Sequence, residues 1–370
     1  MISAPAKILL IRPRRIGDVL LSSALLRALR KAFPQTELDY LTTAPCAEVL
    51  QGNPHVDRVL AYPRHSRPWM YAQVTQRLRR SKYDAVIDLE GARTTARLTW
   101  LSQSPVRIGY NSSATGWAYT HKVPEQDERL YWVLAQAELL RPLGVELDSI
   151  RTELFLNEWD RARGARILRQ LGLSGDMRFA AMTPGSAAPH NIWPLKRFAQ
   201  VADHLAERWG HRTVLLYGPG QEGFVRAVRN AARYPELCII ATTPTMREAA
   251  AVLERSTLYV GSDTGTRHVA IAMGIPTVGV FGRQFPERWT PPDSPEHVQV
   301  AFDPGCKAKC TYRTCAHYAC IRTIPVDSTI EALDFLLARE GNIVLPAVAT
   351  ASGRPLARSL ELHDQTTVSM

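Results

Sequence analysis

Short apolar runs alternate with amphipathic stretches along most of this chain. The apolar runs predict buried strands at 8–11, 37–41, 58–62, 85–89, 178–183, 212–217, 238–240, 258–261 and 277–281. Between them, apolar positions recur at helical spacing and predict helices, notably at 19–32, 194–209, 222–233 and 245–253. Strands that alternate with helices are typical of doubly wound α/β folds with parallel sheets.

The length of the chain predicts two such domains, because 370 residues exceed the size at which a single core usually stops growing. We expect an N-terminal domain over 1–160 and a C-terminal domain over 175–325, with the break between 154 and 175. A terminal helix is expected at 326–344. Residues 345–370 are rich in Ala, Thr, Ser and Pro without periodicity, which predicts a disordered tail.

Composition indicates a soluble globular protein, since 45% of the residues are apolar and the mean hydropathy is −0.16. No apolar run reaches the roughly 18 residues of a transmembrane helix. The N-terminus also lacks an apolar region followed by a cleavage site. The sequence therefore predicts a cytoplasmic protein.

The stretch YVGSDTGTRHVAIAMGIPTVGVFG, residues 259–282, carries the strongest chemical signal. Its first apolar run ends in a polar turn that opens a short helix, and the free N–H groups of a helix start favour phosphate. Thr264 and Gly265 allow close approach of a ligand, Asp263 can accept from sugar hydroxyls, and His268 lies within one turn. A second interpretation is that Asp263 and Thr264 only cap the helix.

The first strand is followed by a basic loop and a helix, with Asp18 at their junction. Asp18 fits two roles: the N-cap of the helix, or a general base at the carboxyl end of a strand, where open α/β sheets bind ligands. Arg12, Arg14 and Arg15 around it favour its ionised form and attract an anionic ligand. Position alone does not choose between the two roles.

Together these segments resemble one family. RxxxxGDVLLSSALLRALR at 12–30 and SDTGxxHVAxAMGxPTVGVFG at 262–282 are similar to the ADP-heptose:lipopolysaccharide heptosyltransferases, glycosyltransferase family 9. Further matching segments lie at 83–110, 183–205, 215–222 and 306–320. The likeness covers about residues 7–340 in the family's order.

The resemblance implies two Rossmann-like domains facing a central cleft, the GT-B architecture. It implies inverting transfer of L-glycero-D-manno-heptose from ADP-heptose to an inner-core sugar of lipopolysaccharide, without a metal for the chemistry. Asp18 matches the family's proposed catalytic base, and Arg14, Arg15, Arg93 and Arg97 are the expected acceptor-binding residues. The expected donor-binding residues are Thr183, Gly185, Ser186, Asn191, Lys196, Glu222, Asp263, Thr264, Gly265 and His268.

One position departs from the family pattern. A Lys usually stands two residues before the Trp-Pro pair, where it neutralises the donor pyrophosphate, and here that position holds Asn191. Asn can donate a hydrogen bond but supplies no charge to the departing anion. Lys196 and Arg197 are the nearest cations along the chain that could replace it.

Charge and aromatic residues gather in the segment 58–107. The whole chain has a net charge of +10. This segment alone contains ten Lys or Arg and three acidic residues. Trp69, Tyr71 and Trp100 are interleaved with them, which predicts contact with anionic lipid at the inner membrane or with a phosphorylated lipid A and core acceptor. A merely solvated basic face is the alternative. No nucleic-acid motif accompanies the charge, so no nucleic-acid partner is expected.

Four cysteines crowd into residues 306–320: Cys306, Cys310, Cys315 and Cys320. Disulfides are disfavoured in a reducing cytoplasm, whereas clustered thiolates suit a structural Zn or Fe ion. The spacing lacks the CxxC knuckle of most structural zinc sites, so free thiols remain an alternative.

Two other functions stay open. One is a transferase of the same fold whose acceptor is a surface adhesin protein, which an iron-binding cysteine cluster favours. The other is a non-catalytic binding or assembly protein on a degenerate transferase scaffold, which Asn191 favours and which intact Asp18 and Asp263 oppose.

Overall fold

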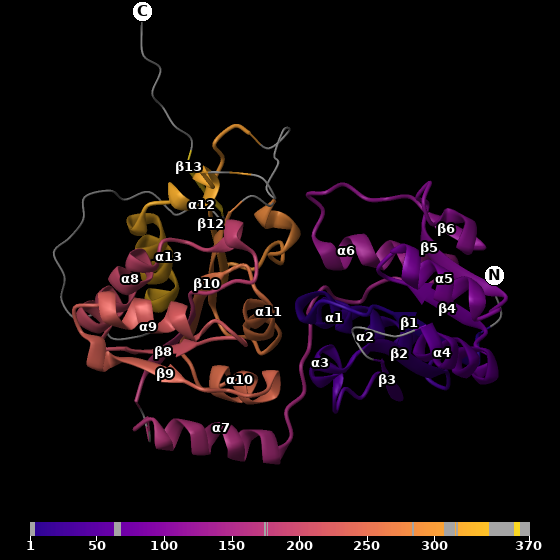
Figure 1. Cartoon of the computed structure of the whole chain (residues 1–370), viewed down its shortest axis with the longest axis horizontal. Coiled ribbons are helices and arrows are strands. Elements are labelled where there is room, and N and C mark those ends of the chain that lie inside the picture. The colour runs from indigo at the N-terminus through magenta and orange to yellow at the C-terminus, as the bar shows by residue number, and fades with distance from the viewer. Residues whose placement is uncertain are drawn as a thin grey trace, which may run out of the picture. The chain divides into compact units, whose positions relative to one another are not determined.

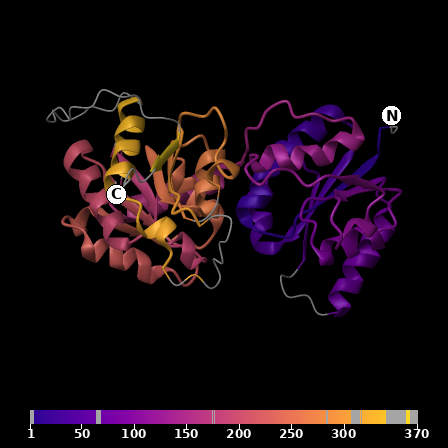
Figure 2. The same ribbon diagram turned by 90° about the horizontal axis from the view of Figure 1, so that it is seen from above.

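The computed structural model describes residues 4–62, 68–173, 175, 177–282, 285–306, 315, 317–339 and 359–362. The chain divides into two compact units, Met1–Asn157 and Glu158–Met370, each with a parallel sheet of its own. In both, helices flank the layer of parallel strands (Figures 1 and 2). Among the described helices, none has the length and apolar character needed to span a membrane.

The N-terminal unit contains a six-stranded parallel sheet in the order β3-β2-β1-β4-β5-β6. Its strands are β1 Lys7–Ile11, β2 Glu37–Thr43, β3 Arg58–Tyr62, β4 Ala85–Asp88, β5 Val106–Tyr110 and β6 His121–Val123. Its helices are α1 Ile16–Leu21, α2 Ser23–Ala32, α3 Ala44–Ala47, α4 Pro68–Ser81, α5 Arg93–Leu101 and α6 Trp132–Ala137, with 3-10 turns η1 Glu48–Leu50, η2 Gly116–Ala118 and η3 Glu138–Leu143. The strand order reverses between β1 and β4, where open α/β sheets place their ligands.

The C-terminal unit contains a seven-stranded parallel sheet in the order β13-β12-β11-β10-β7-β8-β9. Its strands are β7 Phe179–Thr183, β8 Arg212–Leu216, β9 Cys238–Ala241, β10 Leu258–Ser262, β11 Thr277–Phe281, β12 His297–Phe302 and β13 Ser359–Leu362. Its helices are α7 Glu158–Gln170, α8 Leu195–Trp209, α9 Glu222–Ala231, α10 Met246–Leu253, α11 Gly265–Ala272, α12 Ala319–Arg322 and α13 Val326–Arg339, with 3-10 turns η4 Pro189–Asn191, η5 Pro235–Leu237 and η6 Pro286–Arg288. Here the order reverses between β7 and β10.

The predicted alternation of strands and helices is confirmed, and all nine expected strands are present. Sequence reasoning missed β5, β6, β12 and β13, which lie away from the sheet centres and carry polar or glycine residues within short runs. The strand β13 also falls inside the tail for which we expected disorder. It pairs in parallel with β12, so the prediction of disorder is wrong for this segment.

The helix expected at 19–32 is two helices separated at Ser22. The Ser22 hydroxyl donates to the Val19 carbonyl at 2.6 Å and shares a hydrogen bond with the Tyr40 hydroxyl at 2.7 Å. A serine that bonds the backbone of the preceding turn competes with regular helical bonding, which accounts for the interruption.

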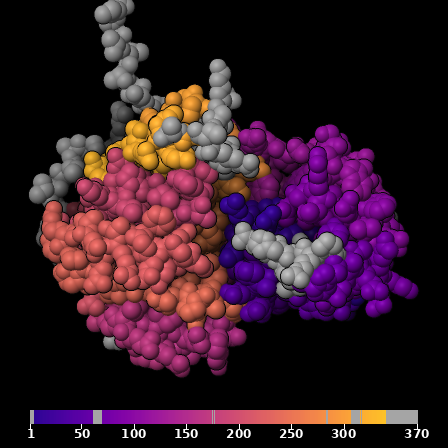
Figure 3. Space-filling model, in the orientation of Figure 1, coloured from indigo at the N-terminus to yellow at the C-terminus, as the bar shows by residue number. Residues whose placement is uncertain are grey.

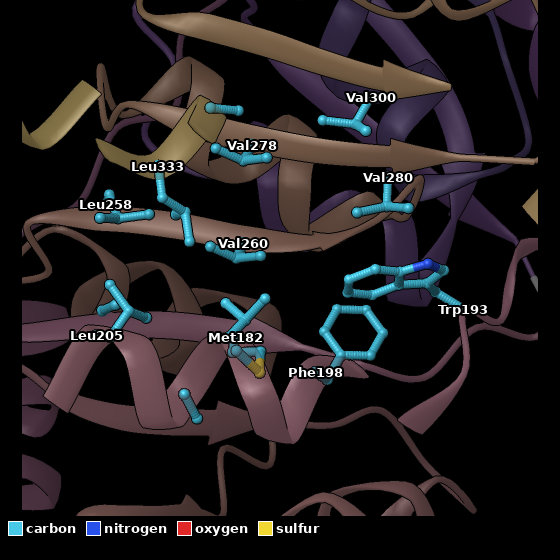
Figure 4. Packing of buried hydrophobic residues seen from close by; sticks show 14 of the residues in the cluster. Met182, Trp193, Phe198, Leu205, Leu258, Val260, Val278, Val280, Val300 and Leu333 are labelled. Atoms are coloured by element: carbon cyan, nitrogen blue, oxygen red, sulfur yellow. The ribbon is translucent and has the colours of Figure 1, made fainter. Parts of the chain in front are cut away.

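The core of the C-terminal unit lies between the sheet and the helices α8 and α13 (Figure 4). Trp193 and Phe198 pack edge to face with ring centroids 5.0 Å apart, and the Trp193 indole N–H donates to the Ile324 carbonyl at 3.0 Å. Burial of each such side chain contributes about 1.5–3 kcal/mol to stability. The indole therefore anchors the segment between β7 and α8, which carries several predicted donor residues.

Helix α7 belongs to the C-terminal unit, because it packs tightly on α10. A Cβ at Gly164 would lie 2.6 Å from the Ala251 Cβ, so only glycine allows this approach. The buried Asp160 and Arg247 form an ion pair across the same contact, with an Nε–Oδ1 distance of 3.1 Å. The expected domain limits at 160 and 175 left this helix unassigned, whereas the units divide between Asn157 and Glu158.

We expect His297 to make the stability of the C-terminal unit pH dependent. Burial, with a smaller effect of the Arg267 charge, lowers the pKa of His297 to about 3, from an ordinary value of 6.5. Below pH 6.5, His297 binds a proton in the unfolded chain but stays neutral in the folded chain. The contribution of His297 to the free energy of unfolding is therefore complete above pH 6.5 and is lost as the pH falls towards 3. Between pH 6.5 and 3, the free energy of unfolding of wild type, measured in urea, should fall more steeply than that of His297→Gln. The difference should be up to about 1.4 kcal/mol per pH unit. His121→Gln is the control, and equal slopes for wild type and His297→Gln would contradict the prediction.

Candidate functional site

Asp18 lies in the first turn of α1, at the carboxyl edge of the N-terminal sheet. It is the third residue of the helix rather than its N-cap, which is Arg15. One carboxylate oxygen accepts from the Arg15 backbone N–H at 2.9 Å, and the other lies 3.1 Å from Arg12 Nη2. Both donors fix the direction of the carboxylate. Asp18 is therefore not the N-cap itself but the N3 residue of a capping box, fixed on two sides.

Arg12 ties the two central strands of this sheet together. From the end of β1, its buried guanidinium donates to the Leu89 carbonyl just after β4 at 2.8 Å and lies over the Trp132 ring at 5.5 Å. Burial opposes the charge of Arg12, yet the neighbouring Asp18 and Glu90 carboxylates raise its pKa above the ordinary value. Arg12 therefore remains a cation that holds Asp18 in place.

The loop after β4 places a second carboxylate, that of Glu90, near Arg12, and sequence reasoning gave it no role. The buried Asp88 shapes this loop, because it accepts from the backbone N–H groups of Glu90 and Gly91 at 3.0 Å and from the Tyr119 hydroxyl at 2.8 Å. Burial raises the pKa of Glu90, while Arg12 opposes that shift. Acidic residues directly after a strand next to β1 were the available sequence signal.

In the C-terminal unit, α11 begins directly after the loop that follows β10. Thr264 is its N-cap, but no side chain caps the helix, and the Thr264 hydroxyl shares a hydrogen bond with the Tyr259 hydroxyl at 3.3 Å instead. The interpretation of Asp263 and Thr264 as mere capping side chains is therefore wrong. Asp263 Oδ1 lies 3.6 Å from Nε2 of the buried His268, and the Gly265 N–H lies at the helix start.

The loop after β7 lies beside the Asp263 loop, because β7 and β10 are neighbours with Thr183 opposite Gly261. Thr183 and Ser186 are buried, and the Ser186 hydroxyl accepts from the Ala188 N–H at 3.2 Å. A Cβ at Gly185 would lie 2.8 Å from the Phe224 ring, so this position requires glycine. The structure thus brings two predicted donor loops together at the point where the strand order reverses.

Three other predicted donor residues lie on the elements next to these loops. Asn191 is buried at the end of η4, and Lys196 is exposed in the first turn of α8. Arg197 is committed elsewhere, since its guanidinium donates to the carbonyls of Arg322 and Ile324. Helix α9 lies at the surface of the unit (Figures 1 and 3). Its first residue, Glu222, is exposed and pairs with Arg226 at 2.7 Å.

The predicted acceptor residues divide into two groups. Arg14 and Arg15 are exposed beside Asp18. Arg93 and Arg97 are exposed on α5 with Trp100, at positions that share one helix face. Trp100 and Trp117 are each about half exposed and pack edge to face at 6.0 Å. We call Trp100, Trp117, Arg93 and Arg97 the tryptophan–arginine surface.

The described cysteines do not form a metal site. Cys310 lies outside the described residues, Cys306 is exposed, and Cys315 and Cys320 are partly buried. Cys315 Sγ accepts from the Tyr318 N–H at 3.3 Å. Within the described part of the chain, no three His, Cys, Asp or Glu residues are placed to hold a metal ion. Because Cys310 lies outside the described residues, the structural Zn or Fe expected at the four cysteines stays a prediction.

Comparison with known proteins gives a consistent result. The model of glycosyltransferase family 9 (heptosyltransferase) matches residues 71–319. A lipopolysaccharide heptosyltransferase 3 of Escherichia coli is 25% identical over 288 residues, which are 74% of this chain and 83% of that protein.

Two solved structures share the fold over nearly the whole chain. A family 9 glycosyltransferase from Veillonella parvula matches with a TM-score of 0.76 and 22% identity over 90% of this chain and 97% of that one. The Escherichia coli ADP-heptose lps heptosyltransferase II matches with a TM-score of 0.73 and 21% identity over 90% and 99%. The predicted fold class of two Rossmann-like domains, the GT-B architecture, is confirmed.

Proposed function

The chain belongs to glycosyltransferase family 9, the heptosyltransferase family, and from that premise we propose that it transfers L-glycero-D-manno-heptose from ADP-heptose to an inner-core sugar of lipopolysaccharide, with inversion. The observation that carries the proposal is the carboxylate of Asp18, held by Arg12 and the Arg15 N–H at the switch point of the N-terminal sheet. The uncapped start of α11 at the switch point of the C-terminal sheet supports it.

In the proposed reaction, Asp18 takes the proton from an acceptor hydroxyl. The hydroxyl oxygen forms a bond to the anomeric carbon of heptose, and the bond from that carbon to the diphosphate oxygen breaks. ADP leaves with the electron pair, so the sugar passes through a state with positive charge on the ring and growing negative charge on the diphosphate. The orphan N–H groups and positive end of α11 suit that anion, and Asp263 suits the heptose hydroxyls.

The charge missing at Asn191 is supplied, in this proposal, by Lys196. Arg197 is unsuitable because its guanidinium is spent on two backbone carbonyls. Lys196 stands exposed in the first turn of α8, which follows the Thr183–Ser186 loop through η4. A flexible ammonium in that place can reach a diphosphate as a point charge.

We also propose that the protein acts in the cytoplasm with peripheral contact to the inner membrane through the tryptophan–arginine surface. Half-exposed indoles are costly in water and favoured at the headgroup level of a bilayer. The two neighbouring arginines add attraction to anionic lipid, about 1 kcal/mol each near the surface. The same surface would keep the enzyme near a lipid-linked acceptor.

Asp18→Asn should lower kcat by about 10² or more and leave ADP affinity unchanged, because a general base loses proton affinity while the donor loops stay intact. The measurement is turnover of ADP-heptose with a heptose-free core acceptor, and Asp127→Asn, an exposed carboxylate of the same unit, is the control. Wild-type turnover in Asp18→Asn would reduce Asp18 to a helix-stabilising role. A folded wild type that modifies only an adhesin protein would move the proposal to that acceptor class.

ADP should bind with a dissociation constant in the low to middle micromolar range, roughly −6 to −8 kcal/mol. Lys196→Ala should weaken binding about tenfold through loss of one charge-assisted bond, whereas the exposed Arg255→Ala of the same unit should not. Calorimetry measures both. Tight binding of UDP or GDP without binding of ADP would sink the heptose assignment. Equal ADP affinity for wild type and Lys196→Ala would show that backbone groups alone hold the diphosphate.

The double variant Trp100→Ala/Trp117→Ala should lose about tenfold or more of the affinity for vesicles of phosphatidylglycerol and phosphatidylethanolamine. Cosedimentation of the full chain measures this affinity. Trp159→Ala is the matched control, because Trp159 is 63% exposed on α7 in the other unit. Equal loss in the control, or no vesicle binding by wild type, would contradict membrane contact through this surface.

A further inference from the structure

Arg267 is fully buried in the first turn of α11, directly beside the predicted donor residues. Its guanidinium donates to the Trp289 carbonyl and to the Thr290 hydroxyl, both at 3.0 Å, and lies over the Phe281 ring at 4.9 Å. A buried guanidinium costs several kcal/mol unless its donors are satisfied, so this position is an expensive one for ordinary packing. A methionine would fill similar space without that cost.

The sheet is built to admit this side chain. Gly279 lies on β11, opposite Gly261 of β10, and a Cβ at Gly279 would lie 2.5 Å from Arg267 Nε. Any residue other than glycine there would displace the guanidinium. The charge is also felt inside the core, because it adds to burial in lowering the pKa of His297.

The two hydrogen bonds of Arg267 hold the segment just after η6 against α11. The Trp289 ring, half-buried, packs edge to face on His268 with centroids 6.0 Å apart. His268 in turn lies 3.6 Å from Asp263 Oδ1. A continuous set of contacts therefore runs from Arg267 through Trp289 and His268 to the donor loop.

We propose that Arg267 is a positioning residue of the donor site, which fixes the main chain at Trp289 and Thr290 so that the indole holds His268 against Asp263. The guanidinium is fully buried, so in this proposal it acts on a ligand through His268 rather than by direct contact. The inference rests on the proposed function for the identity of the ligand, a nucleotide sugar. It predicts that binding of the sugar half of the donor depends on Arg267, whereas binding of ADP does not.

A planar guanidinium can donate from two of its nitrogens at once, to the Trp289 carbonyl and the Thr290 hydroxyl. An ammonium at the same depth reaches one of them. Arg267→Lys and Arg267→Met should therefore behave alike. Each should weaken ADP-heptose binding about tenfold and raise its KM, while ADP affinity changes by less than about threefold. Side-chain NMR signals of His268 in the full chain should shift or broaden in both variants, without any ligand present.

The matched control is Arg247→Met, which removes a buried arginine from the α7–α10 contact. It should lower stability without changing the ratio of ADP-heptose to ADP affinity or the His268 signals. Trp289→Leu keeps the carbonyl that Arg267 binds and removes only the ring, so it tests the same path if the Arg267 variants do not fold. It should reproduce their His268 shift and their affinity ratio.

The outcomes separate this inference from the proposed function. If wild type turns out to transfer no heptose but His268 signals move in the Arg267 or Trp289 variants, the positioning role stands and the assigned reaction falls. If the His268 signals and the affinity ratio match wild type in the folded variants, Arg267 is a packing residue and the inference is overturned. Full rescue by Arg267→Lys would also overturn it, since charge alone would then suffice.

Discussion

A buried guanidinium at the carboxyl edge of each sheet has to keep its hydrogen bonds, and the loops around both candidate sites are arranged to supply them. In the N-terminal unit, Arg12 binds the Leu89 carbonyl and Asp18. In the C-terminal unit, Arg267 binds the Trp289 carbonyl and Thr290. Because an unpaired buried charge costs several kcal/mol, any movement of these loops away from the arginine is strongly opposed. The loops are therefore held in place, because moving them would leave a buried guanidinium without its partners.

The two arginines serve different chemistry. Arg12 touches the carboxylate that performs proton transfer in the proposed reaction, so it sets the direction of Asp18. The hydrogen bonds of Arg267 to the Trp289 carbonyl and the Thr290 hydroxyl fix the position of the main chain. This difference fits the general division in a glycosyl transfer, in which the acceptor side needs a base and the donor side needs preorganised dipoles for a departing anion.

The proposed donor site of this chain has more backbone donors than side-chain charges. The position that usually carries a Lys is a buried Asn191, and Arg197 is spent on carbonyls. What remains is the uncapped start of α11, the glycine at 185 that packs against Phe224, and the exposed Lys196. Preorganised N–H groups require no rearrangement as negative charge develops, so their accurate placement matters correspondingly more. In the proposed function, this is the physical reason why the Arg267–Trp289–His268 contacts would matter.

The sequence by itself determined the class of the fold and the loops that carry chemistry. Apolar periodicity located the central strands, because buried parallel strands are nearly continuous apolar runs. Turn residues after them located Asp18 and the Asp263 loop, since the carboxyl ends of parallel strands meet at one edge of a sheet. The roles of these residues in binding and catalysis remain predictions. Edge strands such as β6 and β13 escaped notice because short strands with polar positions carry little periodic signal.

Only the tertiary structure decided which side chains hold these loops in place and which atoms they bind. The Arg12–Leu89 bond joins residues 77 positions apart, and no local pattern encodes such a contact. Arg267 reads in sequence as an ordinary polar helix residue, yet the glycine at 279 on a neighbouring strand leaves room for it in the core. Burial, pairing and the resulting charge states depend on what neighbouring elements place around a residue. These properties arise when the sheet assembles, and a linear pattern of apolar and polar positions does not contain them.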